Sequence, residues 1–88
     1  MRVTLILFAM LRDHLPSEVE AQTRAGNELT LEVPDGTSVQ EIIDRFNLPS
    51  PLVHLVLVNG VHISPAALAG HVLNADDEVA IWPPIGGG

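Results

Sequence analysis

The stretch Asp77-Glu78-Val79-Ala80-Ile81-Trp82-Pro83-Pro84 runs directly into Ile85-Gly86-Gly87-Gly88, where the chain ends. Residues 78–82 are predicted to form the last strand. Glycine has no Cβ and adopts backbone conformations closed to other residues, so a glycyl carboxylate can enter a narrow slot and be attacked from either side. We therefore interpret Gly88, together with Gly87, as the reactive group of the protein. The alternative is a frayed tail, because chain termini are usually poorly ordered.

The first strand is expected over residues 2–10. Alternate residues of a strand point to opposite faces. Both sets contain apolar side chains here, because one set is Val3, Leu5, Leu7 and Ala9 and the other is Arg2, Thr4, Ile6 and Phe8. A strand that is apolar on both faces is typical of the interior of a sheet. We expect the first and last strands to lie side by side in the middle of the sheet.

The middle of the chain supplies a further strand and the only strong helix. Residues 11–27 are polar and are predicted to form a loop with one helical turn, whereas residues 28–33 alternate strictly and are predicted to form a strand. A helix follows, capped by Thr37 or Ser38 and completed by a capping box with Gln40 or Glu41. Its apolar stripe and its terminating prolines are Val39, Ile42, Ile43 and Phe46, then Pro49 and Pro51.

A hairpin and the overall class follow from the remaining pattern. Residues 52–58 form another apolar strand, and Asn59-Gly60 indicates a tight hairpin because both central positions of such a turn need positive φ. The return strand begins at residues 61–63. One helix across a mixed sheet of four or five strands is an α+β sandwich of two layers. We assign residues 1–82 to a single domain and residues 83–88 to a flexible C-terminal tail.

The composition excludes several classes of protein. The chain has 88 residues, of which 47% are hydrophobic, which suits one domain with one core. No apolar run approaches the ~20 residues of a membrane span. The start lacks a signal-peptide cleavage site, so a cytoplasmic location is expected. The net charge of −7 disfavours nucleic-acid binding, which relies on cationic side chains meeting phosphates.

The chain contains no cysteine and no lysine. Disulfides, thiolate metal sites and a persulfide on the protein's own side chain are therefore excluded. No side chain can accept an isopeptide bond. The histidines show no spacing typical of metal ligands, so no metal site is expected at His14, His54, His62 or His71.

Three stretches of the sequence resemble the ubiquitin-like sulfur carriers of the MoaD/ThiS group. They are Leu7-Phe8-Ala9 followed by Leu11-Arg12, Val58-Asn59-Gly60, and residues 77–84 leading into a terminal Gly-Gly. The pair of prolines after an aromatic residue is most similar to the small subunit of molybdopterin synthase. The resemblance implies a ubiquitin-like β-grasp fold. The chain departs from the pattern by a third glycine, and by Asp76 where a glycine is usual, although Asp tolerates the left-handed conformation.

The resemblance also implies a chemistry for Gly88. A ubiquitin-activating-type adenylyltransferase would use ATP and Mg²⁺ to adenylate the carboxylate, and a persulfide sulfur donor would then displace AMP to leave a thiocarboxylate. The sulfur would pass to a cyclic pterin precursor held by the large catalytic subunit of molybdopterin synthase, in a heterotetramer. This chain has no phosphate-cradling loop of the Walker type, so it cannot carry out the adenylation itself, and no bound cofactor is expected.

A partner would need a surface beside the tail. Ile6 and Phe8 share a face of the first strand, and Trp82 lies on the neighbouring strand. We predict that a docking surface is formed by Phe8, Trp82, Pro83, Pro84 and Gly86. The alternative is that the two aromatic residues pack in a minor core. Residues 83–88 span about 20 Å when extended, enough to reach a buried site in a partner.

Three other functions remain open at this point. The chain is alternatively a sulfur carrier for another pathway, such as thiamine or cysteine synthesis. It is otherwise a ubiquitin-like protein modifier, whose Gly88 would be joined to lysines of target proteins. The third alternative is a plain binding module with an inert tail.

Overall fold

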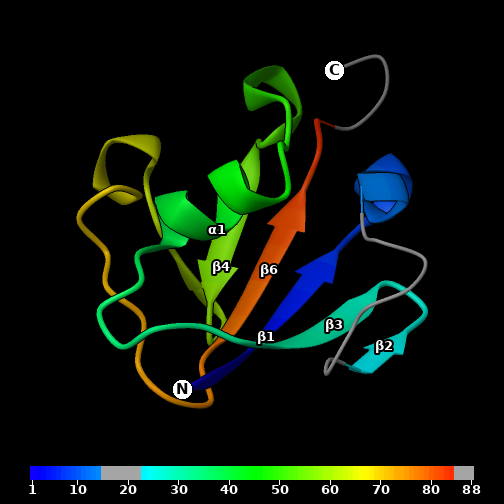
Figure 1. Cartoon of the computed structure of the whole chain (residues 1–88). Coiled ribbons are helices and arrows are strands. Elements are labelled where there is room, and N and C mark those ends of the chain that lie inside the picture. The colour runs from blue at the N-terminus through cyan, green and yellow to red at the C-terminus, as the bar shows by residue number, and fades with distance from the viewer. Residues whose placement is uncertain (15–22, 85–88) are drawn as a thin grey trace.

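A mixed sheet with the strand order β2-β3-β1-β6-β4-β5 carries the helix α1 on one face (Figure 1). The structure is a computed structural model that describes residues 1–14 and 23–84. Its strands are β1 (Arg2–Leu7), β2 (Thr23–Ala25), β3 (Glu28–Glu32), β4 (Leu55–Val58), β5 (Val61–His62) and β6 (Glu78–Trp82). Its helices are α1 (Val39–Arg45) and the 3₁₀ turns η1 (Ala9–His14), η2 (Ser50–Leu52) and η3 (Pro65–Ala67). The predicted two-layer α+β class is confirmed.

The first and last strands lie side by side in the centre of the sheet, as predicted. β1 and β6 are parallel, with Leu5 paired with Val79 and Leu7 paired with Ile81. All the other strand pairs are antiparallel. Parallel neighbours need a long crossover connection, which the segment containing α1 supplies. The chain therefore enters and leaves the sheet on adjacent strands.

The core lies between α1 and the sheet face that it covers. Val3, Leu5 and Leu7 of β1 are at most 1% exposed, and Val39, Ile42 and Ile43 of α1 pack in the same cluster. The alternate residues Thr4 and Ile6 are only half-buried, because they point to the uncovered face. One face of the sheet is therefore committed to the core, and the other is free for contacts with other molecules.

The first strand is shorter than predicted, and one strand was missed. β1 ends at Leu7 rather than at residue 10, because Ala9 adopts a φ of 52° and turns the chain into η1. The expected loop over residues 11–27 contains the short strand β2, which pairs with β3 and adds one strand to the four or five expected. A strand of three residues carries too little alternation to be recognised in a sequence.

The helix starts as predicted but ends for a different reason. Ser38 is the N-cap and forms the full capping box with Glu41. Asn47, at a φ of 53°, stands directly after the C-cap, and the Leu48 N–H reaches the Ile43 carbonyl at 3.2 Å. This is the pattern of a Schellman ending. The predicted terminators Pro49 and Pro51 lie beyond this ending, at η2.

A buried carboxylate ties the β4–β5 hairpin to the start of β6. Asn59 and Gly60 have φ values of 51° and 83°, which confirms the predicted turn. The Asn59 Nδ2 donates to Asp77 Oδ1 at 2.8 Å, and the Asn74 N–H donates to Asp77 Oδ2 at 2.8 Å. The Glu78 N–H donates to Asn59 Oδ1 at 2.9 Å. Asp77 is only 8% exposed, so these bonds replace water around its carboxylate.

Asp77→Asn is expected to lower the free energy of unfolding by about 1–3 kcal/mol, because an amide would turn an NH₂ group toward one of the two donors. Asn59→Gly removes the Asn59–Asp77 bond and the Glu78–Asn59 bond, leaves the bond from Asn74 to Asp77, and keeps the positive φ. Urea denaturation measures both variants. Asp76→Asn is the control, since Asp76 has a φ of 69° that Asn tolerates, and a change under about 0.5 kcal/mol is expected. Equal stability of the Asp76 and Asp77 variants would contradict the role of the cluster.

Candidate functional site

The uncovered face of the sheet carries an apolar surface across three adjacent strands. The register pairs Ile6 of β1 with Ala80 of β6, and Ala80 with Leu57 of β4, so these three side chains form one row. Phe8, which directly follows β1, and Trp82 of β6 lie two residues further along the chain than Ile6 and Ala80. Since side chains two apart in an extended chain point the same way, all four belong to the uncovered face. We name this surface the docking face and define it by Ile6, Phe8, Leu57, Ala80 and Trp82.

Phe8 and Trp82 stack face to face at the end of the two central strands. Their ring centroids are 3.9 Å apart, and the rings are within 6° of parallel. The Phe8 N–H donates to the Ile81 carbonyl at 3.0 Å, which extends the pairing of the strands beyond β1 and holds the two rings in register. Both side chains are half-buried, and neither lies in the core cluster beneath α1. Because the two rings stack on each other and are only half-buried, their exposed parts form one continuous aromatic surface that a partner can cover.

The docking face is hollowed. A cavity of about 340 Å³ is lined by its five residues together with Asn59, Gly60 and Glu78. Among these lining residues Glu78 carries the only charge, and it is exposed. The surface is thus an apolar centre with a polar, acidic margin, which is the usual composition of a protein interface.

The chain leaves the sheet directly beside this face. The Trp82 carbonyl accepts the His54 N–H at 3.1 Å, which holds the last strand residue in the sheet. Pro83 is buried and Pro84 is half-buried, so the first two residues of the predicted tail still pack on the domain. The predicted site residues Gly86, Gly87 and Gly88 lie outside the described residues. The face and the exit of the tail are therefore fixed by the same strand.

The structure brings together the predicted residues Phe8, Trp82, Pro83 and Pro84. Their contacts with a partner remain a prediction. Sequence reasoning missed Leu57 and Ala80, although the apolar run over residues 52–58 contained a signal in its alternation. Strand register across β6 was needed to place them, because pairing partners are not encoded by local alternation.

Residues 1–14 and 23–84 form neither a cluster of metal ligands nor a membrane-spanning helix. No three histidine, cysteine, aspartate or glutamate side chains of these residues gather closely enough to hold a metal ion. No helix formed by them has both the length and the apolar character needed to cross a bilayer.

The fold and this face define the class as a ubiquitin-like protein with an open sheet surface beside its C-terminal segment. A solved structure, SAMP1 from Haloferax volcanii, matches it with a TM-score of 0.68 over 100% of both chains. The identity is 22%, so this likeness shows the fold alone. The model of the ThiS family matches residues 8–88, and the chain therefore belongs to this family of ubiquitin-like sulfur carriers. No curated protein matches the chain.

Phe8→Ala is expected to lower the free energy of unfolding by about 1–2 kcal/mol, because a half-buried ring and one aromatic contact are lost. Leu7→Ala is the matched core variant, since Leu7 is fully buried, and about 2–5 kcal/mol is expected. Urea denaturation followed by circular dichroism measures both. Phe8→Ala should also change the fluorescence of Trp82, the only tryptophan of the chain. A loss as large as that of Leu7→Ala would assign Phe8 to a core instead of a surface.

Proposed function

We propose that this sulfur carrier is the small subunit of a molybdopterin synthase and donates sulfur from a thiocarboxylate on Gly88. The observation that supports this most is the stacked Phe8–Trp82 pair, which stands on the open face immediately before Pro83 and Pro84. A partner that covers this pair would hold the beginning of the tail. The glycines that follow can then enter a narrow active site.

The proposed chemistry starts from the Gly88 carboxylate, which is a poor electrophile. One carboxylate oxygen attacks the α-phosphorus of ATP, pyrophosphate leaves, and an acyl adenylate forms. The terminal sulfur of a persulfide donor then attacks the acyl carbon, and AMP leaves with the bonding electron pair. A second thiol of the donor cleaves the resulting acyl disulfide, which yields the thiocarboxylate and a disulfide on the donor.

The chain itself contributes a carboxylate, a tail and a docking face to these steps. It contains no cysteine, so no side chain of its own competes for the sulfur. Ordering residues 85–88 in a partner costs about 4–8 kcal/mol. The apolar docking face offsets this cost, and the fixed φ of Pro83 and Pro84 reduces it at the start of the tail.

The proposed partners follow from these needs. A ubiquitin-activating-type adenylyltransferase uses ATP and Mg²⁺ to activate Gly88, and the chain binds no cofactor of its own. A persulfide donor supplies the sulfur. The large catalytic subunit of molybdopterin synthase covers the docking face in a heterotetramer and holds the cyclic pterin precursor.

A second candidate function is conjugation of Gly88 to lysines of target proteins. The ubiquitin-like fold suits it as well, and it shares the adenylation step. A carrier for thiamine or cysteine synthesis is the third. These functions differ only in what attacks the activated carbonyl group or receives the sulfur.

Intact mass spectrometry tests the carrier chemistry. After incubation with ATP, an activating enzyme and a persulfide donor, we expect one oxygen to be replaced by sulfur, with the change mapped to Gly88. Deletion of both Gly87 and Gly88 should abolish the change and leave the fold intact, whereas deletion of Gly88 alone would still leave the terminal pair Gly86-Gly87. An unchanged mass, with the activating enzyme proven on another carrier, would contradict the proposal.

The choice of acceptor is tested with the thiocarboxylated protein. Mixed with a molybdopterin synthase large subunit and the cyclic pterin precursor, it should consume the precursor and return to the carboxylate form. Trp82→Ala should slow this reaction at least about tenfold at limiting protein, because the aromatic anchor is lost. In a parallel incubation of the carboxylate form with ATP, the activating enzyme and lysine-containing proteins, formation of an isopeptide bond with release of AMP, without consumption of the precursor by the thiocarboxylated protein, would favour the modifier function.

A further inference from the structure

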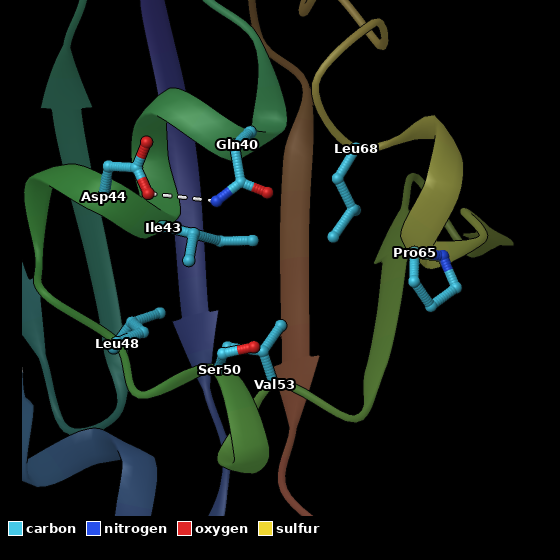
Figure 2. Close-up of a pocket in the computed structure, with 8 residues that line it drawn as sticks. All are labelled: Gln40, Ile43, Asp44, Leu48, Ser50, Val53, Pro65 and Leu68. Carbon is cyan, nitrogen blue, oxygen red and sulfur yellow. Dashed lines mark hydrogen bonds between the residues drawn. The ribbon is translucent and has the colours of Figure 1, made fainter.

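A second hollow lies on the helix side of the molecule, between α1 and the turns η2 and η3 (Figure 2). Its volume is about 240 Å³. We name it the helix groove and define it by Gln40, Ile43, Asp44, Leu48, Ser50 and Leu68. It stands apart from the docking face, because Ile43 belongs to the core on the covered side of the sheet. No step of the proposed sulfur chemistry uses it.

The apolar walls of the helix groove are held by backbone hydrogen bonds. The Schellman ending of α1 places Leu48 beside Ile43, with the Leu48 N–H donating to the Ile43 carbonyl at 3.2 Å. On the other wall, the Gln40 N–H donates to the Leu68 carbonyl at 3.1 Å, which fixes the first turn of α1 against η3. The groove is therefore part of the framework of the fold.

The polar side chains that line the helix groove have more hydrogen-bond acceptors than the described residues supply donors for. The Gln40 Nε2 donates to Asp44 Oδ1 at 3.0 Å, and this bond leaves Gln40 Oε1 and Asp44 Oδ2 without a protein partner among the described residues. The Ser50 hydroxyl lines the same hollow and has no side-chain bond within the described part of the chain either. A guest that satisfies these oxygens must bring donors.

No cationic side chain among the residues described lines the helix groove to neutralise Asp44. The neighbouring Arg45 instead reaches the Glu32 carbonyl at 3.4 Å and lies over the Phe46 ring at 5.7 Å. Asp44 is exposed at the margin of the hollow, and its carboxylate has no cationic partner among the described residues that line it. A cation from outside the chain is its natural complement.

We propose that the helix groove binds an arginine side chain of a partner protein. The three-carbon stem of arginine packs on apolar walls while its head stays polar. The guanidinium has five N–H donors and no acceptor, which matches the oxygens of Asp44, Gln40 and Ser50. Arginine is also enriched at protein interfaces. Because the site is on the other side of the sheet, a partner could occupy it while the docking face is covered.

The experiment is an NMR titration of the ¹⁵N-labelled chain with N-acetyl-arginine methylamide. Saturable shifts are expected at the amides of Gln40, Asp44, Ser50 and Leu68, with a dissociation constant on the order of millimolar. The matched neutral probe is N-acetyl-citrulline methylamide, which has nearly the same shape and no charge. It should produce no saturable shifts in the helix groove.

Asp44→Asn is the decisive variant, since the Asn oxygen can still accept from Gln40 and α1 is preserved. It should raise the dissociation constant about threefold to tenfold, because the pair is partly solvated. Asp76→Asn removes the same charge at an exposed position outside the groove and should leave binding unchanged. Thermal unfolding checks that both variants remain folded.

Three results would overturn the proposal. Equal binding of the citrulline probe would show an apolar groove with no role for charge. Shifts centred on Glu28 or Glu78 of the open sheet face would place the cation elsewhere. An unchanged constant in folded Asp44→Asn would remove the carboxylate from the site. None of these results bears on the mass test of Gly88, so the two proposals stand or fall separately.

Discussion

The parallel pairing of β1 with β6 fixes the position of both the core and the open face of the sheet. Because the two strands run in the same direction, their ends meet at one edge of the sheet, and Phe8 comes to lie against Trp82. The intervening chain must cross over, and α1 covers one face as it does so (Figure 1). The same pairing thus builds the core, leaves one face open and places the exit of the tail at that face.

The two faces of the sheet have different roles, one in stability and the other in association. The covered face holds almost all of the fully buried side chains, so substitutions there act on stability. The open face holds half-buried apolar side chains with an acidic margin, so substitutions there act on association. The helix groove adds a third surface, formed where α1 ends beside η2 and η3. A small carrier can in this way contact more than one partner without changing its fold.

Local signals in the sequence predicted those elements whose hydrogen bonds are local. The capping box of Ser38 and Glu41 and the turn at Asn59-Gly60 are confirmed, because each is decided by residues no more than three positions apart. The end of α1 at Asn47 was open to the same reasoning, since asparagine tolerates positive φ, but the following prolines gave a more obvious signal. β2 was missed because its partner β3, and not its own three residues, makes it a strand.

Patterns in consecutive residues were sufficient to predict the class of fold, the central position of the first and last strands, and the family to which the terminal glycines point. Alternation and capping depend on residues that are close together in the sequence, so both can be recognised without knowledge of the tertiary contacts. Leu57 and Ala80 join Phe8 and Trp82 only through the pairing of the strands, and Asp44 comes to the margin of a groove lined by no cationic side chain of the described residues only through the packing of α1 beside η2 and η3. These arrangements depend on strand register and on helix placement, which are fixed by packing between segments distant along the chain.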